Sequence, residues 1–182
     1  MTHAIENSCN VYFYELGRRL GIDRLDEYAK KFGLGEYTGI ELTEETAGHM
    51  ASPEYKKQAV VNVTDSDWFG GDTLQAAIGQ SYSLFTPVQL ANYCATIANG
   101  GTRYKVNLID SIRSSVDGSV VEEFGSEVVE KIDMDPQTVD QIHNGMKKVV
   151  DEGSARSIFE GYPIAVGGKT GTAQLGKGAN NA

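Results

Sequence analysis

The sequence predicts an α+β fold, with helices and strands in separate stretches of the chain. Four segments show helical spacing of apolar residues or helix-capping signals, which favours a largely helical body. Two runs rich in β-branched residues flank an Asp-Gly pair, a combination typical of a β-hairpin. At 182 residues we expect one domain, with two lobes at most, that buries a substantial core.

The first two helices are expected over residues 10–21 and 23–33. Asp23 is the expected N-cap of the second, and acidic residues follow it in the first turn. The apolar residues of this helix recur at helical spacing and predict a buried face: Leu25, Tyr28, Ala29 and Phe32. Residues 34–71 contain several glycine and proline breakers, so we expect loops and short elements there.

The third helix is expected to begin at Thr86-Pro87-Val88-Gln89. Threonine can cap the helix, proline suits its first turn, and glutamine can reach back to the cap. Helical spacing then predicts a buried stripe: Leu90, Cys94 and Ile97.

The strands and the last helix are expected in the second half of the chain. Strands are predicted over residues 106–112 and 120–124, joined at Asp117-Gly118. Asp135-Pro136 begins a helix that ends at Gly153. Its expected apolar face consists of Val139, Ile142, Met146, Val149 and Val150. Residues 164–174 are expected to form an extended segment that leads into a glycine- and asparagine-rich tail.

Composition and charge exclude several classes of function. A formal net charge of -9, spread along the chain, repels phosphate backbones and argues against a nucleic-acid partner. The apolar stretches are far shorter than a membrane span, and residues 1–10 do not resemble a signal peptide. Cys9 and Cys94 can form one disulfide, but we expect two free thiols. The three histidines are dispersed, so no metal site is predicted.

Two short motifs carry the chemistry. The first is Ser8-Cys9-Asn10, and the second is Lys169-Thr170-Gly171-Thr172. Taken alone, the first motif is better explained as a helix N-cap, and the second can be a strand that ends in a turn. The second motif also matches the end of a phosphate-binding loop. That pattern needs a glycine where Pro163 stands and a helix afterwards, so we set it aside.

Together, and in this order, the motifs resemble the set Ser-x-x-Lys, Ser-x-Asn and Lys-Thr-Gly of penicillin-binding proteins and serine β-lactamases. The longer stretches that are similar to the class B, high-molecular-weight penicillin-binding proteins are residues 8–14, 71–80, 86–91, 95–101 and 167–174. The resemblance covers nearly the whole chain. It implies a helical lobe with an antiparallel sheet that is incomplete in this sequence.

The resemblance implies roles in serine acyl transfer for residues of both motifs. Ser8 relays a proton to the leaving amine, because a hydroxyl both donates and accepts. The Asn10 amide holds the substrate's peptide group, and Lys169 places positive charge beside Ser8 and the substrate carboxylate.

The remaining residues of the second motif are implied to bind substrate. The hydroxyls of Thr170 and Thr172 bind its carboxylate, and Gly171 allows a close backbone approach. The backbone N–H of Thr172 is half of an oxyanion hole.

The chain departs from the family pattern in one respect. No serine in it is followed by lysine three residues later, so the motif that supplies the nucleophile and its lysine base is absent. We therefore expect residues 1–182 to be a partial transpeptidase domain, cut at both ends and inactive in isolation. An incomplete sheet is also expected to leave strand edges exposed, which favours self-association.

By resemblance, the parent protein cross-links peptidoglycan on the outer side of the bacterial cytoplasmic membrane, held by an anchor helix outside this chain. It takes stem peptides that end in D-alanyl-D-alanine, is inhibited by β-lactams and needs no cofactor. A β-lactamase would add a deacylating glutamate, for which Glu41, Glu44 and Glu45 are the candidates. Two more hypotheses stay open: a β-lactam sensor, and a non-catalytic module that binds peptidoglycan or a partner.

Overall fold

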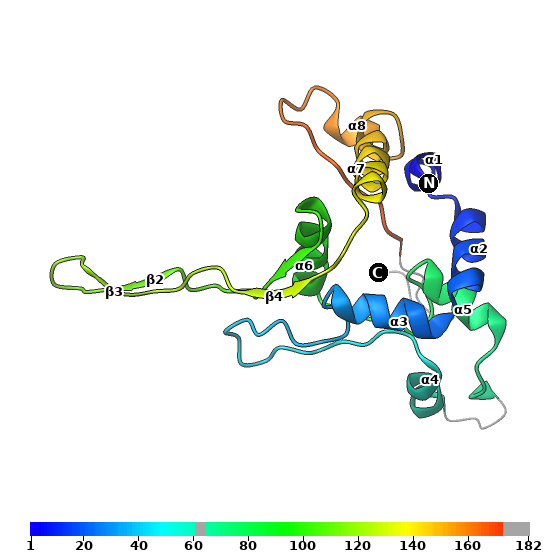
Figure 1. Ribbon diagram of the computed structural model, residues 1–182, viewed down its shortest axis with the longest axis horizontal. Helices are drawn as coiled ribbons and strands as arrows, with labels where there is room; N and C mark the ends of the chain where they lie inside the picture. Colours follow the sequence, from blue (N-terminus) through cyan, green and yellow to red (C-terminus); the bar gives the residue numbers. More distant parts are fainter. Residues whose placement is uncertain (61–64, 173–182) are drawn as a thin grey trace, which may run out of the picture. The chain divides into compact units, whose positions relative to one another are not determined.

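The structure is a computed structural model that describes residues 1–60 and 65–172. The chain divides into two compact units, whose helices are labelled in Figure 1. The first comprises Met1–Ile22, Pro53–Tyr82 and Asp135–Ala182, and the second comprises Asp23–Ser52 and Ser83–Met134. Each unit is assembled from segments that are distant in sequence, so neither is a simple half of the chain.

The first unit is helical. Its helices are α1 (Thr2–Glu6), α2 (Asn10–Leu20), α4 (Pro53–Ala59), α5 (Gly70–Ala77), α7 (Pro136–Asp151) and α8 (Arg156–Phe159). The core lies where α1 packs on α7 and the start of α8. Its buried residues are Ile5, Val149, Val150 and Ala155, and partly buried apolar side chains surround them. None of the helices in residues 1–60 and 65–172 combines the length and apolarity needed to cross a membrane.

Glycines allow these helices to approach each other closely. A β-carbon at Gly145 of α7 would lie 2.9 Å from Cβ of Ile5 on α1. A β-carbon at Gly17 of α2 would overlap Cβ of Ala77 on α5. Because backbones in contact leave no room for a side chain, these glycines determine where α1 and α2 lie.

A buried ion pair holds α4 to α5 in the same unit. The Lys56 ammonium lies 2.8 Å from the Asp72 carboxylate and donates to the Asp67 carbonyl at 2.6 Å. The Asp72 carboxylate also accepts from the Phe69 backbone N–H at 2.8 Å and so caps the first turn of α5. The pair therefore fixes the helix start as well as the helix contact.

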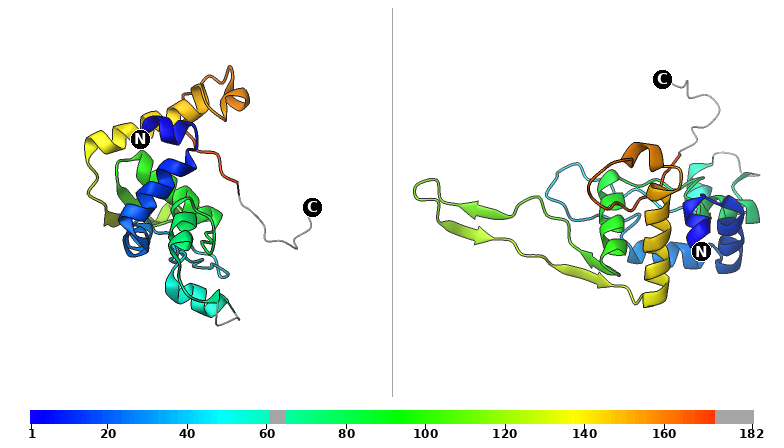
Figure 2. Two further views of the ribbon diagram at one scale, coloured as in Figure 1. Left: turned by 90° about the vertical axis from the view of Figure 1, so that its right-hand side faces the viewer. Right: turned by 90° about the horizontal axis from the view of Figure 1, so that it is seen from above.

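The second unit contains two helices and two small antiparallel sheets. The helices are α3 (Ile22–Lys31), whose first residue belongs to the other unit, and α6 (Pro87–Ala98). The strands are β1 (Thr102–Tyr104), β2 (Ser111–Arg113), β3 (Val120–Glu123) and β4 (Val128–Lys131). β1 pairs with β4 and β2 with β3, and the two pairs follow one another along an extended ribbon (Figure 2).

One buried side chain organises the second unit. Gln89 is 1% exposed. Its amide oxygen accepts from the Thr86 backbone N–H at 2.9 Å, which completes the expected capping box of α6. Its amide nitrogen donates to the carbonyls of Glu36 and Ala47, at 2.5 and 2.6 Å. A single side chain thus joins the helix start to both ends of a long loop.

Several expected elements are confirmed. Helix α2 ends before Gly21, and Gly33 follows α3 with φ +79°. Helix α7 begins after Asp135, whose carboxylate caps it through the Thr138 N–H at 2.8 Å. Its expected apolar face is buried or half-buried throughout. The β2–β3 hairpin forms around Asp117-Gly118, and both cysteines are free thiols.

Other expectations were wrong. Residues 106–110 are not a strand, because the Glu41 carboxylate takes the Leu108 backbone N–H at 2.9 Å and removes it from strand pairing. Leu90 and Cys94 are exposed, because the loop of residues 36–47 packs on the Gln89 side of α6 instead. Tyr28 is 42% exposed, so it lies outside the buried face of α3.

Some helix boundaries also differ from the expectation. Helix α3 begins at Ile22, so Asp23 lies in its first turn rather than at the cap. Gly70 and Gly71, expected as breakers, are the first two residues of α5, because Asp72 caps that turn. Of the segment expected to be extended, Ile164 lies in a bend and residues 165–172 form neither helix nor strand, whereas residues 173–182 lie outside the described part. Self-association stays a prediction.

The close approach of α1 to α7 makes Gly145→Ala a test of this packing. Alanine normally stabilises a helix, but here the added methyl meets Ile5, and we expect a loss of about 1–3 kcal/mol from overpacking. Gly71→Ala is the matched control. No atom lies within 4 Å of a methyl there, so a gain of about 0.4–1 kcal/mol is expected. Urea unfolding measures both, and a stabilised Gly145→Ala variant would contradict the packing.

Replacing Gln89 tests the organisation of the second unit. Gln89→Leu keeps the volume but removes three hydrogen bonds, so we expect a loss of about 2–4 kcal/mol. The control Gln137→Leu, at an exposed position of α7, should change stability by less than about 0.5 kcal/mol. Thermal unfolding followed by circular dichroism measures both. Equal melting temperatures for the two variants would rule out the proposed role.

Candidate active site

Ser8 lies in the turn between α1 and α2. Its φ of +50° is in the left-handed region, which a non-glycine residue adopts at a cost of about 1–2 kcal/mol. Cys9, not Ser8, is the N-cap of α2. The Ser8 side chain therefore does not cap α2, and its exposed hydroxyl is available for other contacts.

The structure brings Ser8 together with Lys169, 161 residues further along the chain. The Lys169 ammonium donates to Ser8 Oγ at 2.5 Å and to the Thr170 carbonyl at 2.9 Å. A longer contact, at 3.4 Å, joins it to Thr170 Oγ1. All three residues belong to the first unit. The two motifs that are far apart in sequence therefore form one polar cluster.

The cluster carries the positive charge of the Lys169 ammonium. In the described part of the chain no acidic side chain forms an ion pair with Lys169. Partial burial lowers the pKa of Lys169 below its ordinary value, because desolvation penalises the ammonium form. An ammonium surrounded by neutral oxygens is a natural receptor for an anionic ligand.

The other expected site residues are placed less closely. Asn10 is the exposed first residue of α2, two positions after Ser8. Thr170, Gly171 and Thr172 follow Lys169 in exposed chain that belongs to no helix or strand. The fold thus puts all six residues in one unit, but only Ser8, Lys169 and Thr170 are joined by hydrogen bonds among themselves in the described residues.

Two residues of the cluster were missed from sequence. Ser154 Oγ lies 3.1 Å from Thr170 Oγ1, and Gln80 donates its amide to the Thr172 carbonyl at 2.6 Å. Gln80 ends one of the stretches that resemble penicillin-binding proteins, which was its only signal. Ser154 had none, because a serine in a turn after a helix is unremarkable.

Two of the three glutamates considered for deacylation, Glu41 and Glu45, accept hydrogen bonds in loop structure. The Glu45 carboxylate accepts from the backbone N–H and hydroxyl of Thr38, both at 2.6 Å. Desolvation opposes the effect, but these hydrogen bonds lower the pKa of Glu45 overall. The hydrogen bond from the Leu108 backbone likewise lowers the pKa of Glu41. A carboxylate with a lowered pKa is a weaker base. The hydrogen bonds of Glu41 and Glu45 therefore stabilise the loops rather than favour deacylation.

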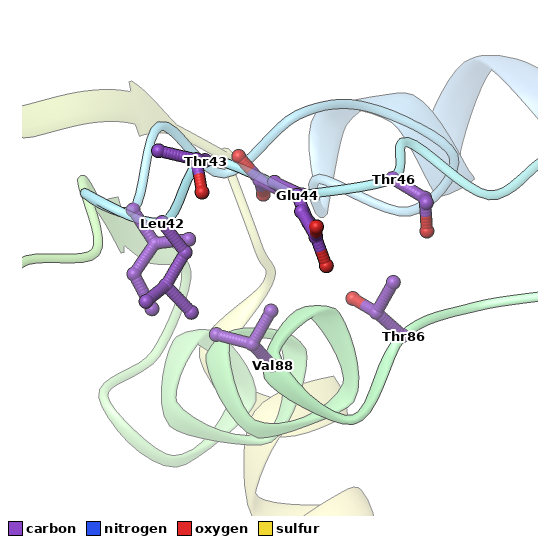
Figure 3. A pocket seen from close by; sticks show the side chains of 8 residues that line it. Leu42, Thr43, Glu44, Thr46, Thr86 and Val88 are labelled. Atoms are coloured by element: carbon purple, nitrogen blue, oxygen red, sulfur yellow. The ribbon is translucent and has the colours of Figure 1, made fainter.

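A pocket of about 390 Å³ opens in the second unit, between the loop of residues 40–46 and the start of α6 (Figure 3). It is lined by Ile40, Leu42, Thr43, Glu44, Glu45, Thr46, Thr86 and Val88. No residue of the two sequence motifs lines it. The candidate active site is therefore the polar cluster of the first unit.

Comparison with known families agrees with the fold and the motifs. The model of the penicillin binding protein transpeptidase domain matches residues 1–182. The chain therefore belongs to the penicillin-binding protein transpeptidase family. Within the family it is similar to peptidoglycan D,D-transpeptidase MrdA of Haemophilus influenzae, with 34% identity over 179 residues. This alignment covers 96% of the chain and 26% of that protein.

Solved structures show the same relationship. A chain of a peptidoglycan synthase complex matches with a TM-score of 0.78 and 37% identity, over 97% of this chain and 28% of that one. Penicillin-binding protein PBP2 of Helicobacter pylori matches with a TM-score of 0.76 and 28% identity, over 96% of this chain and 30% of that one. The chain thus spans between a quarter and a third of the length of these relatives.

The lowered pKa of Lys169 predicts how the site responds to pH. The ammonium should lose its proton at a midpoint below 10.5, whereas the hydrogen bond to Glu152 raises the pKa of Lys148 above that value. The unfolded chain binds the Lys169 proton more tightly than the folded chain does. The contribution of Lys169 to folding stability therefore increases as the pH rises from its lowered pKa to 10.5. NMR titration of the lysine side-chain nitrogens measures both midpoints. A Lys169 midpoint at or above that of Lys148 would contradict the described environment.

Proposed function

We propose that this chain provides the part of a peptidoglycan D,D-transpeptidase active site that binds substrate and relays a proton. The observation that carries the proposal is the contact between Lys169 and Ser8, 2.5 Å long and spanning 161 residues. The substrate is a stem peptide that ends in D-alanyl-D-alanine, whose terminal carboxylate is the anion the site receives. The names of the relatives support this substrate class.

Each residue has a role that fits its position. Lys169 attracts the carboxylate, and the hydroxyls of Thr170 and Thr172 donate to it. Ser8 accepts a hydrogen bond from Lys169 and so keeps its own proton free for the leaving amine.

The roles of the neighbouring residues follow from the same substrate position. Asn10, at the start of α2, holds the substrate's peptide group through its amide. Gly171 leaves room for the substrate backbone, and the Thr172 N–H stabilises the developing oxyanion.

The chemistry needs a nucleophile that these residues do not supply. In serine acyl transfer, a hydroxyl oxygen attacks the scissile carbonyl, the bond to the terminal D-alanine breaks, and the leaving amine takes a proton. No serine in residues 1–182 has a lysine three positions later to act as its base. The chain therefore binds substrate and can pass on a proton, but it does not form the acyl-enzyme by itself. β-Lactams, which share the carboxylate, occupy the same site.

The setting of the whole protein belongs to the same proposal. A transpeptidase of peptidoglycan works on the outer side of the cytoplasmic membrane, and we place the protein that contains this segment there, held by a membrane anchor. The PBP2 of Helicobacter pylori, 28% identical over 96% of this chain, has been solved in complex with MreC. An assembly of that kind is the partner class that the proposal implies.

Mass spectrometry and peptide binding test the function together. After incubation with excess benzylpenicillin, the intact mass of the chain should be unchanged, because the nucleophile is missing. The chain should nevertheless bind diacetyl-L-lysyl-D-alanyl-D-alanine reversibly. Lys169→Met should weaken this binding by roughly tenfold or more, as expected for one charged hydrogen bond. The control Lys147→Met removes an exposed lysine on α7 and should leave it unchanged.

Two outcomes would contradict the proposal. A stoichiometric penicillin adduct on Ser8 would make Ser8 a nucleophile rather than a relay. Peptide binding that survives Lys169→Met undiminished would favour the non-catalytic module that recognises peptidoglycan through another surface.

A further inference from the structure

The segment of residues 169–172 is held by contacts from several directions. Among the described residues it pairs with no strand. It follows Gly168, whose backbone N–H donates to the Met146 carbonyl of α7 at 3.0 Å. Beyond that anchor, hydrogen bonds join it to three side chains from other parts of the unit: Ser8, Ser154 and Gln80. Side chains therefore decide how the segment presents its hydroxyls.

Hydrogen-bond counting gives Ser154 a specific place in this arrangement. A hydroxyl has one proton and two lone pairs, whereas an ammonium only donates. Thr170 Oγ1 therefore accepts from Lys169, at 3.4 Å. When the Thr170 proton points to a bound carboxylate, the 3.1 Å contact with Ser154 is satisfied only if Ser154 is the donor. The result is a chain of donors that runs from Ser154 through Thr170 to the anion, and each bond polarises the next.

The backbone around Ser154 is firmly anchored. Gly153 donates its N–H to the Lys148 carbonyl at 2.8 Å, and Ala155 donates to the Val149 carbonyl at 3.0 Å. Ala155 is 6% exposed and belongs to the core of the first unit. Ser154 thus lies between two fixed residues, and its hydroxyl contacts a residue 16 positions away rather than its own turn. A serine that served only the turn would bond to local backbone groups.

We propose that Ser154 is a positioning residue that orients the Thr170 hydroxyl toward the terminal carboxylate of the stem peptide. The inference rests on the proposed function, because it needs the carboxylate to be the bound group. It goes beyond that function by assigning recognition of the carboxylate to a residue outside both sequence motifs.

The experiment compares two ligands that differ only in the anion. The ligands are diacetyl-L-lysyl-D-alanyl-D-alanine and its C-terminal primary amide, titrated into the full chain by NMR. The measured quantity is the preference, defined as the dissociation constant of the amide divided by that of the acid. Ser154→Ala should lower the preference by about three- to tenfold, as expected for one neutral hydrogen bond, while the affinity for the amide stays the same. Ser154→Thr restores the hydroxyl and should restore the preference.

Two control variants separate orientation from folding. Ser157→Ala, at an exposed position on α8, should behave as the unmodified chain. Gln80→Ala removes the contact to the Thr172 backbone but not the contact between Ser154 and Thr170, so it should weaken the binding of both ligands. Backbone amide spectra report whether each variant keeps its fold.

Each possible result decides between the claims. A Ser154→Ala variant that keeps the full preference, or that loses both ligands equally, overturns the role of Ser154. If Lys169→Met abolishes the preference and Ser154→Ala does not, the proposed function stands and only this inference fails. An unmodified chain with no preference for the acid overturns both.

Discussion

The site depends on the packing of α1 against α7. Ile5 fits over Gly145, where even a methyl group would collide with it, and Val149 and Val150 complete the buried contact. Ser8 lies two residues after the end of α1, and the Gly168 backbone N–H donates to the Met146 carbonyl of α7. The same helix therefore carries both halves of the polar cluster, and the left-handed turn at Ser8 brings its hydroxyl to Lys169.

Electrostatics then defines what the cluster can do. Lys169 is bonded to neutral oxygens, and desolvation already lowers its pKa, so an anion that arrives there is attracted and stabilises the charged form in return. The hydroxyls of Ser8 and Thr170 contact this charge, the Ser154 hydroxyl contacts Thr170, and all three can hold or pass on protons. In the second unit, the carboxylates of Glu41 and Glu45 instead accept hydrogen bonds from the backbone N–H groups of Leu108 and Thr38.

Local signals made much of the fold predictable. Capping at Thr86 and Asp135, the stop at Gly33 and the Asp-Gly hairpin all depend on residues near one another in sequence, and all are confirmed. The errors arose where a distant group competes with a local pattern. The Leu108 backbone N–H donates to Glu41 rather than to a strand. Gln89 bonds to the loop of residues 36–47, so this side of α6 is buried and the predicted Leu90 and Cys94 are exposed.

The candidate site was likewise predictable where the signal was local and not where it depended on distant contacts. Its motifs identified Ser8 and Lys169, but only the structure joins Ser154 to Thr170. The measurement that tests the central claim most directly is the position of the peptide's terminal alanine. Isotope-filtered NMR on the complex with diacetyl-L-lysyl-D-alanyl-D-alanine should show its methyl group close to the methyls of Thr170 and Thr172. Contacts instead with Leu42 and Val88, which line the pocket of the second unit, would contradict the account.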